Sequence, residues 1–415
     1  MSKQKHILLI TFFVVVIAAL AAEYFFAKEK PYVEKIIEQV IPVDHSKEIR
    51  PVLTKFDSIF NATNDSSGAV GTAVVITYKG QVVLKKCYGV KVIGENNPID
   101  ENTIFRLASV SKTVSGVLAG ILANEQLVNL DEKVSDILPG FRLKNEENTR
   151  SLLVRHLLSH STGLEPHAFD MMVEDLVPLD QIIARLNEAE IAAPPGKVYA
   201  YQNVMFSVFA PIVQEKTKKS FQQLMQEKVF EPFGMKNASL DFESFENNPN
   251  KAFPHQQTEK SFKTLKLNNR YYETAPAAGV NASISDMGQF LLAISSDDDD
   301  LFPKAARQIT FTPQIESPLK RSYYRNWGAL GTKYYALGWR VIQFKGHTIA
   351  HHAGYVSGYQ SEIAVCPDYE TGIAVLTNSP NNMFSTNIHA YLSMLTDYFH
   401  EKEQLLSDSI PAKAQ

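Results

Sequence analysis

A serine and a lysine stand three residues apart in FRLASVSKTVSG, residues 105–116, where an extended apolar run gives way to a long apolar helix. At helical spacing, residues i and i+3 share a face, so the Lys112 amine can reach the Ser109 hydroxyl. The start of a helix also offers unpaired N–H groups that favour a developing oxyanion. Because a serine hydroxyl needs a base to become a nucleophile, the pair indicates acyl transfer through Ser109.

Lysine acts as a base near neutral pH only if burial or a nearby cation lowers its pKa from about 10.4. No Asp or Glu occurs within residues 105–116 to oppose such a shift. The alternative interpretation is that Ser109 caps a helix and Lys112 is a solvated residue of the first turn. The Ser-x-x-Lys pattern occurs at two other places in the chain, so by itself it does not decide between these interpretations.

Two further stretches carry groups for the same chemistry. In YQN, residues 201–203, a phenol and an amide stand two apart. The Tyr201 phenol can transfer protons, and the Asn203 amide can form hydrogen bonds to a substrate carbonyl or to the lysine. In HAGY, residues 352–355, a glycine in a strand lets a substrate approach backbone N–H groups, which suits an oxyanion hole.

Three histidines, His347, His351 and His352, have spacings that raise the question of a zinc site. No Glu follows His347 in a His-Glu-x-x-His pattern, and the surrounding residues are typical of strands. We therefore expect neither a metal nor another cofactor in this protein.

The order Ser-x-x-Lys, Tyr-x-Asn, His-x-Gly along one chain resembles the signature of the serine β-lactamase and penicillin-binding-protein superfamily. Three more stretches are similar to its class C-like branch, which includes class C β-lactamases, D-alanyl-D-alanine carboxypeptidases, D-aminopeptidases and family VIII esterases. They are VRHLLSHSTGL (154–164), PAAGVNASISDMGQFL (276–291) and YALGWRV (335–341). The likeness covers most of residues 50–400, and we expect His160 in the first stretch to serve packing, not catalysis.

The resemblance implies a role for each motif residue. Ser109 would be the acylated nucleophile, and Lys112 would be its base or the partner that keeps Tyr201 ionised. Tyr201 would relay protons to the leaving group and to the deacylating water. Asn203 would orient the acyl amide of the substrate.

The third motif departs from that of true β-lactamases, which usually carry a lysine where this chain has His352. A histidine is charged at neutral pH only if its surroundings raise its pKa. We therefore expect slow β-lactam hydrolysis and activity closer to the peptidase and esterase members. Gly354 would let the substrate approach, and the backbone N–H groups of Ser109 and Tyr355 would form the oxyanion hole.

Strand-like runs lie near both ends of the chain, at 69–91 with a turn at Lys79-Gly80 and at 359–378, whereas about 113–290 is mainly helical. This order predicts an α/β (α+β) fold. In it, helices flank an antiparallel sheet formed from both chain ends, and a mainly helical subdomain is inserted. The resemblance implies a β-lactamase/transpeptidase-like version of it.

The N-terminus differs in kind from the rest of the chain, because lysines precede 16 uncharged residues at 7–22. This pattern is typical of a signal peptide or of a membrane anchor. Either reading places the rest of the chain outside the cytoplasm, on the periplasmic or cell-surface side, with tethering by residues 7–27 expected. The expected organisation is a leader at 1–27, a stalk at 28–50, a hydrolase domain at 51–400 and a flexible tail at 401–415.

The composition sets limits on function. A chain of 415 residues with 45% hydrophobic residues can bury a large core, and a net charge of −4 without a basic stripe gives no support for nucleic-acid binding. The two cysteines, Cys87 and Cys366, belong to no Cys-x-x-Cys pair and read as small strand residues, although one disulfide stays open.

The sequence thus predicts an extracytoplasmic serine hydrolase acting through an acyl-enzyme. Its substrate would be a D-amino-acid peptide of the peptidoglycan type, a small ester or amide, or a β-lactam. The alternative is a catalytically inactive module that binds cell-wall peptides or a protein partner through the same cleft.

Overall fold

The computed structural model describes residues 43–295, 299–318, 324, 326–328, 330–381, 383 and 386–409. The chain divides into two units, residues 1–44 and 45–415, and the second contains the fold described below. The predicted leader lies outside the described residues. In the part of the chain that is described, none of the helices combines the length and apolar character needed to cross a membrane.

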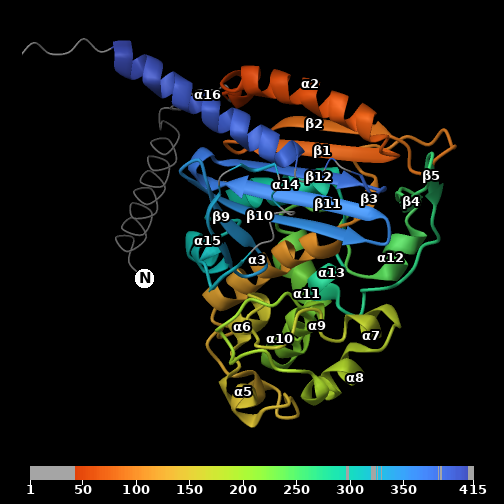
Figure 1. Cartoon of the computed structure of the whole chain (residues 1–415), viewed down its shortest axis with the longest axis vertical. Helices are drawn as coiled ribbons and strands as arrows, with labels where there is room; N and C mark the ends of the chain where they lie inside the picture. Colours follow the sequence, from red (N-terminus) through yellow and green to blue (C-terminus); the bar gives the residue numbers. More distant parts are fainter. Residues whose placement is uncertain are drawn as a thin grey trace, which may run out of the picture. The chain divides into compact units, whose positions relative to one another are not determined.

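An antiparallel sheet of eight strands forms the centre of the described part (Figure 1). Its order is β2-β1-β12-β11-β10-β9-β8-β7, so the first strands of the fold pair with the last one. Thr72 of β1 lies opposite Thr377 of β12, for example. This confirms the predicted sheet from both chain ends. The bounds are β1 Gly71–Tyr78, β2 Gln81–Gly89, β7 Ile315–Glu316, β8 Leu330–Tyr335, β9 Arg340–Phe344, β10 His347–Val356, β11 Tyr359–Cys366 and β12 Thr371–Thr377.

The hairpin predicted at Lys79-Gly80 joins β1 to β2. Both turn residues have positive φ, 45° for Lys79 and 72° for Gly80. Two-residue loops with this geometry match the right-handed twist of the paired strands. The local sequence therefore sets the pairing next to the turn, Tyr78 opposite Gln81, and the register shifts once farther along, between Thr77 and Ile76.

Alternating residues of β1 pack on opposite faces of the sheet, as the period of two in a strand requires. Val74 and Ile76 join a cluster with α2 (Arg50–Ser67) and α16 (Asn387–Ser409), which lie together on one face (Figure 1). Val75 joins the larger cluster on the other face, together with α3 (Ser111–Asn124) and α14 (Ile284–Ser295). The functional motifs all border this larger cluster.

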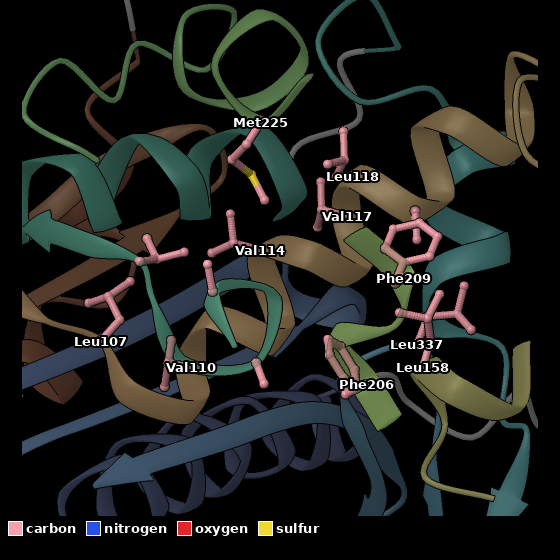
Figure 2. Packing of buried hydrophobic residues seen from close by; sticks show 14 of the residues in the cluster. Leu107, Val110, Val114, Val117, Leu118, Leu158, Phe206, Phe209, Met225 and Leu337 are labelled. Atoms are coloured by element: carbon pink, nitrogen blue, oxygen red, sulfur yellow. The ribbon is translucent and has the colours of Figure 1, made fainter. Parts of the chain in front are cut away.

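Helix α3 runs through the middle of the larger cluster, and every residue from Ser111 to Leu122 is buried. Figure 2 shows Val114, Val117 and Leu118 of this helix packed among side chains from other segments, including Phe209. A helix that is apolar all round belongs inside a domain. The first turn of α3, with Lys112, is therefore held inside the protein.

The inserted subdomain is mainly helical, as predicted, with two small sheets. Its helices are α4 Val134–Ile137, α5 Glu146–Ser151, α6 Val154–Leu158, α7 Asp170–Glu174, α8 Leu179–Ala184, α9 Asn203–Ser207, α10 Phe209–Thr217, α11 Phe221–Met225, α12 Phe242–Asn247 and α13 Ala275–Ala278. The small sheets pair β3 (Ile104–Arg106) with β6 (Asn281–Ser283) and β4 (His255–Gln257) with β5 (Phe262–Thr264), and α15 (Lys304–Phe311) follows.

Two boundaries differ from the sequence prediction. The folded unit begins within the predicted stalk, because Ile49 is fully buried beside α2. At the other end, α16 continues past residue 401 to Ser409, so the expected tail begins as helix. The apolar residues of α16 that pack on the sheet continue to Phe399, which stacks on Tyr78 of β1, and the helix extends beyond that contact.

Both cysteines lie in strands, as expected, and both are free thiols. Burial raises the pKa of Cys87 to about 11 and that of Cys366 to about 12, so neither thiol is a ready nucleophile.

The burial of α3 predicts the stability effect of truncating one side chain. Leu118 is fully buried, so Leu118→Ala should lower the free energy of unfolding by about 2–5 kcal/mol. The matched control is Leu127→Ala, because Leu127 is 38% exposed; it should change stability by about 0.5 kcal/mol or less. Urea titration measures both, and equal losses for the two variants would contradict the packing described for α3.

Candidate active site

Ser109 lies at a sharp turn between a strand and a helix. The chain leaves β3, passes through a 3₁₀ turn at Ala108–Val110 and enters α3. Ala108 has φ of +48°, an uncommon value for a residue with a Cβ, and such strain gathers at functional sites. Ser109 itself is half-buried between fully buried neighbours. The turn thus presents its hydroxyl at the N-terminal end of α3.

The Ser109 hydroxyl does not cap the helix, since the residue at the N-cap of α3 is Val110 and no side chain caps there. Its partner is the hydroxyl of Tyr201, which donates to Ser109 Oγ at 2.7 Å. This contact joins residues 92 positions apart in the chain. The interpretation of Ser109 as a simple helix cap is therefore wrong.

Lys112 is fully buried, so it is not a solvated residue of the first turn. Its amine donates to Asn203 Oδ1 at 2.7 Å and to the carbonyl of Ala277 at 3.0 Å. Burial lowers the pKa of the Lys112 amine well below its usual value, the carboxylate of Asp170 opposes this shift, and the guanidinium of Arg340 adds to it. The surroundings of Lys112 thus favour the neutral form of its amine.

Tyr201 and Asn203 reach the site from the segment that leads into α9. Gln202 between them is extended, with φ of −146°, so the two side chains point to the same side. The Lys112 amine lies 4.6 Å from the centre of the Tyr201 ring. The structure thus brings Ser109 and Lys112 of the first motif together with Tyr201 and Asn203 of the second, as the resemblance implies.

Gly354 brings β10 against the turn that holds Ser109. A Cβ at this position would lie 2.7 Å from both Ser109 N and the carbonyl oxygen of Leu107, so only glycine fits. Strand β10 pairs with β9 up to His351, opposite Arg340, and its later residues contact the Ala108–Val110 turn. Tyr355 follows, 62% exposed at the rim. The oxyanion-hole roles of Ser109 N–H and Tyr355 N–H remain predictions on this geometry.

His352 differs from the lysine of a β-lactamase in charge as well as in type. The ring is fully buried, Nδ1 donates to the carbonyl of Ala353 at 2.9 Å, and Nε2 accepts from the Tyr335 hydroxyl at 2.9 Å. Burial lowers the pKa of His352 well below its usual value, and the cations of Arg340 and Lys112 add to the effect. His352 is therefore neutral, and both of its nitrogens are occupied.

The three histidines near the third motif do not converge on one point. His347 Nδ1 lies 2.9 Å from Asp368 Oδ2, and His351 Nε2 lies 2.8 Å from Glu362 Oε1. His352 bonds to Tyr335, as described above. Each ring has its own partner, so their spacing in the sequence does not translate into a shared site.

Three further residues border the site: His160, which the sequence predicted to serve packing, and Arg340 and Asp170, which it did not single out. The buried ring of His160 lies with its centre 4.3 Å from that of Tyr201. The guanidinium carbon of Arg340 lies 5.9 Å from the Tyr201 ring centre. The carboxylate of Asp170 accepts from Asn203 Nδ2 at 2.9 Å. His160 and Arg340 fall in stretches that resemble the class C-like branch, whereas no motif marks Asp170.

The chain is similar to known proteins over most of its length. A family model described as Beta-lactamase matches residues 56–397. The chain belongs to this family. Among solved structures, a chain titled as the octameric penicillin-binding protein homologue from Pyrococcus abyssi matches with a TM-score of 0.71 and 21% identity, covering 83% of this chain and 77% of that one. This likeness confirms the predicted fold.

Two named proteins are similar in sequence to this β-lactamase-family chain. The unguisins hydrolase ungD′ of Aspergillus campestris is 24% identical over 348 residues, which cover 81% of this chain and 63% of that protein. The protein flp of Staphylococcus aureus strain MW2 is 21% identical over 332 residues, covering 78% of this chain and 62% of that protein. The chain thus spans less than two thirds of the length of these relatives.

The contact between Tyr201 and Ser109 predicts the effect of removing one hydroxyl. Tyr201→Phe keeps the ring that packs on His160 but removes the group bonded to Ser109 Oγ. We expect the rate at which a fluorophosphonate probe labels Ser109 to fall about 10²–10⁴-fold. The control is Tyr88→Phe, because Tyr88 packs on Phe60 at the opposite face of the sheet. Labelling of Tyr201→Phe at the wild-type rate would show that the phenol is not the base.

Proposed function

We propose that this β-lactamase-family protein is a serine hydrolase that works through an acyl-enzyme at Ser109. The observation that carries the proposal is the 2.7 Å hydrogen bond between the Tyr201 hydroxyl and Ser109 Oγ, beside a lysine amine with no access to solvent. A nucleophile in contact with a proton acceptor that a third group controls is the arrangement of covalent catalysis. The name of the hydrolase relative from Aspergillus campestris supports the same reaction class.

The proposed mechanism uses the lowered pKa of Lys112. A neutral Lys112 amine beside the Tyr201 ring favours loss of the phenol proton, and the resulting ammonium stabilises the phenolate. Tyr201 then takes the Ser109 proton as Ser109 Oγ bonds to the substrate carbonyl carbon. The oxyanion is held by the N–H groups of Ser109 and Tyr355. As the bond to the leaving group breaks, Tyr201 returns the proton to the leaving atom, and water repeats the sequence to release the acid.

The neutral state of His352 limits which substrates fit. A substrate that carries a carboxylate on its leaving group, such as a peptide ending in a free D-residue, gains affinity from a cation at that side of the cleft. His352 offers no charge and no free N–H there. Among D-amino-acid peptides, small esters or amides and β-lactams, this favours esters and amides whose leaving group is uncharged.

The proposal that the enzyme works on the outer side of the cytoplasmic membrane, tethered by residues 7–27, rests on the apolar run in the sequence. That compartment would make peptidoglycan-derived amides available as substrates.

Covalent labelling tests the proposed function and separates it from a module that only binds. Fluorophosphonate and fluorescent penicillin probes, followed by peptide mass spectrometry, should modify Ser109 in the wild-type chain and leave Ser109→Ala unmodified. The matched control is Ser111→Ala, two residues on, whose hydroxyl accepts from Val280 N and not from Tyr201. Absence of labelling by every acylating probe would overturn the hydrolase proposal and favour the binding module.

A matched pair of substrates tests the charge preference. The pair is one D-alanyl-D-alanine peptide with a free C-terminal carboxylate and the same peptide with a C-terminal amide. We expect kcat/KM for the carboxylate form to be no higher than for the amide, because no cation supplies the gain of about tenfold that one hydrogen bond to a charged group would give. Nitrocefin, which carries a carboxylate, should be turned over slowly beside p-nitrophenyl esters. A clear preference for the carboxylate form would mean that a cation reaches the leaving-group side.

A further inference from the structure

A line of polar contacts runs from the surface to the buried amine of Lys112. His167 Nδ1 lies 2.7 Å from Asp170 Oδ2, and the same oxygen accepts from Asn203 Nδ2 at 2.9 Å. Asn203 Oδ1 in turn accepts from the Lys112 amine at 2.7 Å. The His167 side chain is 59% exposed and that of Asp170 is 15% exposed, whereas Lys112 is fully buried. The mechanism above uses Lys112 and leaves Asp170 without a role.

The chemistry of the groups dictates the orientation of the amide between them. An ionised carboxylate can only accept hydrogen bonds, so Asp170 admits only the N–H end of the Asn203 amide. The oxygen end must then face Lys112, which is the end that a lysine amine can donate to. With the carboxylate gone, the amide can turn over and present its N–H group to the lysine. One N–H of Asn203 remains for a substrate carbonyl in the native orientation.

We propose that Asp170 is a positioning residue of the Ser109 site: its carboxylate fixes the Asn203 amide and places a negative charge one side chain away from Lys112. This inference rests on the proposed function, because it assigns Asp170 to the same catalytic apparatus. Asp170 touches neither Ser109 nor a substrate, and it acts through Asn203.

Residues near Asp170 have unfavourable backbone angles. His167 and Phe169 have φ of 60° and 61°, and Leu176 beyond α7 has 61°, although none of them is glycine. The N–H of His167 donates to the carbonyl of Tyr201 at 2.8 Å, so the segment is tied to the strand-like run that carries the phenol. Strained backbone of this kind persists where the surrounding structure requires it. Here it delivers one carboxylate to Asn203.

Asp170 Oδ1 gives a second indication. This oxygen is buried and has no hydrogen-bond partner among the described residues, an arrangement that native structures seldom tolerate without a reason. A buried carboxylate oxygen without a hydrogen-bond partner, beside the amide of Asn203, fits a role for the charge of Asp170.

The charges around Lys112 oppose one another. Burial and Arg340 lower the pKa of the lysine amine, and the carboxylate of Asp170 raises it. Asp170 therefore limits the shift that the rest of the site imposes, and its removal must lower the pKa of Lys112 further. The other titratable side chains around the amine are His160, Tyr201 and His352, with His167 behind Asp170. Burial and nearby cations lower the pKa of His160 and that of His352.

The test compares Asp170→Asn and Asp170→Ala with Asp175→Asn, an exposed carboxylate just beyond the same short helix. The rate of Ser109 labelling by a fluorophosphonate is measured from acid to alkaline pH in the full chain. Asp170→Ala should label about tenfold or more slowly at its best pH, because a misplaced amide disturbs the reacting geometry. In Asp170→Asn, which keeps the shape, the acidic limb of the rate should move to lower pH. Asp175→Asn should match the wild type in both respects.

A readout independent of activity keeps the two proposals apart. The ε-carbon of Lys112, labelled with ¹³C and assigned by its loss in Lys112→Met, reports the protonation of the amine by NMR. Its pKa should be lower in Asp170→Asn than in the wild type, whether or not Ser109 reacts. An unchanged pKa together with an unchanged acidic limb would overturn the role of Asp170. Failure of the wild type to label at all would overturn the proposed function, and the NMR comparison would still decide on Asp170.

Discussion

The amine of Lys112 lies where solvent does not reach it, held between the side-chain oxygen of Asn203 and the carbonyl of Ala277. A buried amine favours its neutral form, because the ammonium would lose its hydration. These two acceptors take the two N–H groups of the neutral amine, which leaves its lone pair to accept the proton of the phenol beside it. The arrangement of Ser109, Tyr201 and Asn203 can activate a hydroxyl only while the Lys112 amine is shielded from solvent. The surrounding residues provide that shielding.

Close backbone contacts keep the amine dry. Gly338 has φ of +75°, and a Cβ there would fall 1.9 Å from the carbonyl oxygen of Lys112, so the turn between β8 and β9 sits directly on the first turn of α3. Gly354 makes the same kind of approach to Ser109 N from β10. Around these contacts, Leu158, Phe206 and Leu337 close the apolar side of the site (Figure 2). Close packing of this kind keeps the lysine amine out of contact with bulk solvent.

Much of this arrangement could be predicted from the sequence, and the reasons are local. The Lys79-Gly80 hairpin, the terminal strands and the apolar helix after Ser109 follow from turn chemistry and residue period. The three motifs were found because each keeps its residues within a few positions. The sequence also predicted that Lys112 could reach Ser109, but Asn203 binds the amine and Tyr201 takes its place at the hydroxyl.

The rest could not be predicted, because it depends on contacts between distant segments. Burial and the cations of Arg340 and Lys112 keep His352 neutral, and the Tyr335 hydroxyl donates to its Nε2; the spacing of these residues in the chain does not predict either contact. Asp170 reaches Asn203 through a loop with uncommon backbone angles that have no glycine to mark them. Arg340 affects the site by its charge from a neighbouring strand. Each of these effects belongs to the assembled sheet, not to a motif.

Strand β12, the last strand in the chain, lies between β1 and β11 in the sheet, and this position affects the order in which the protein can fold. Strand β1 pairs on one side with β2, its neighbour in the chain, and on the other side with β12. The pairing of Thr72 with Thr377 can therefore form only after β12 has been synthesised. A nascent chain emerging from the ribosome therefore holds Ser109 long before Gly354 and the last strands exist to complete its surroundings. Pairings over such sequence distances make folding slow. Under the proposed function, the surroundings that Ser109 needs are therefore complete only after nearly the whole polypeptide has been synthesised.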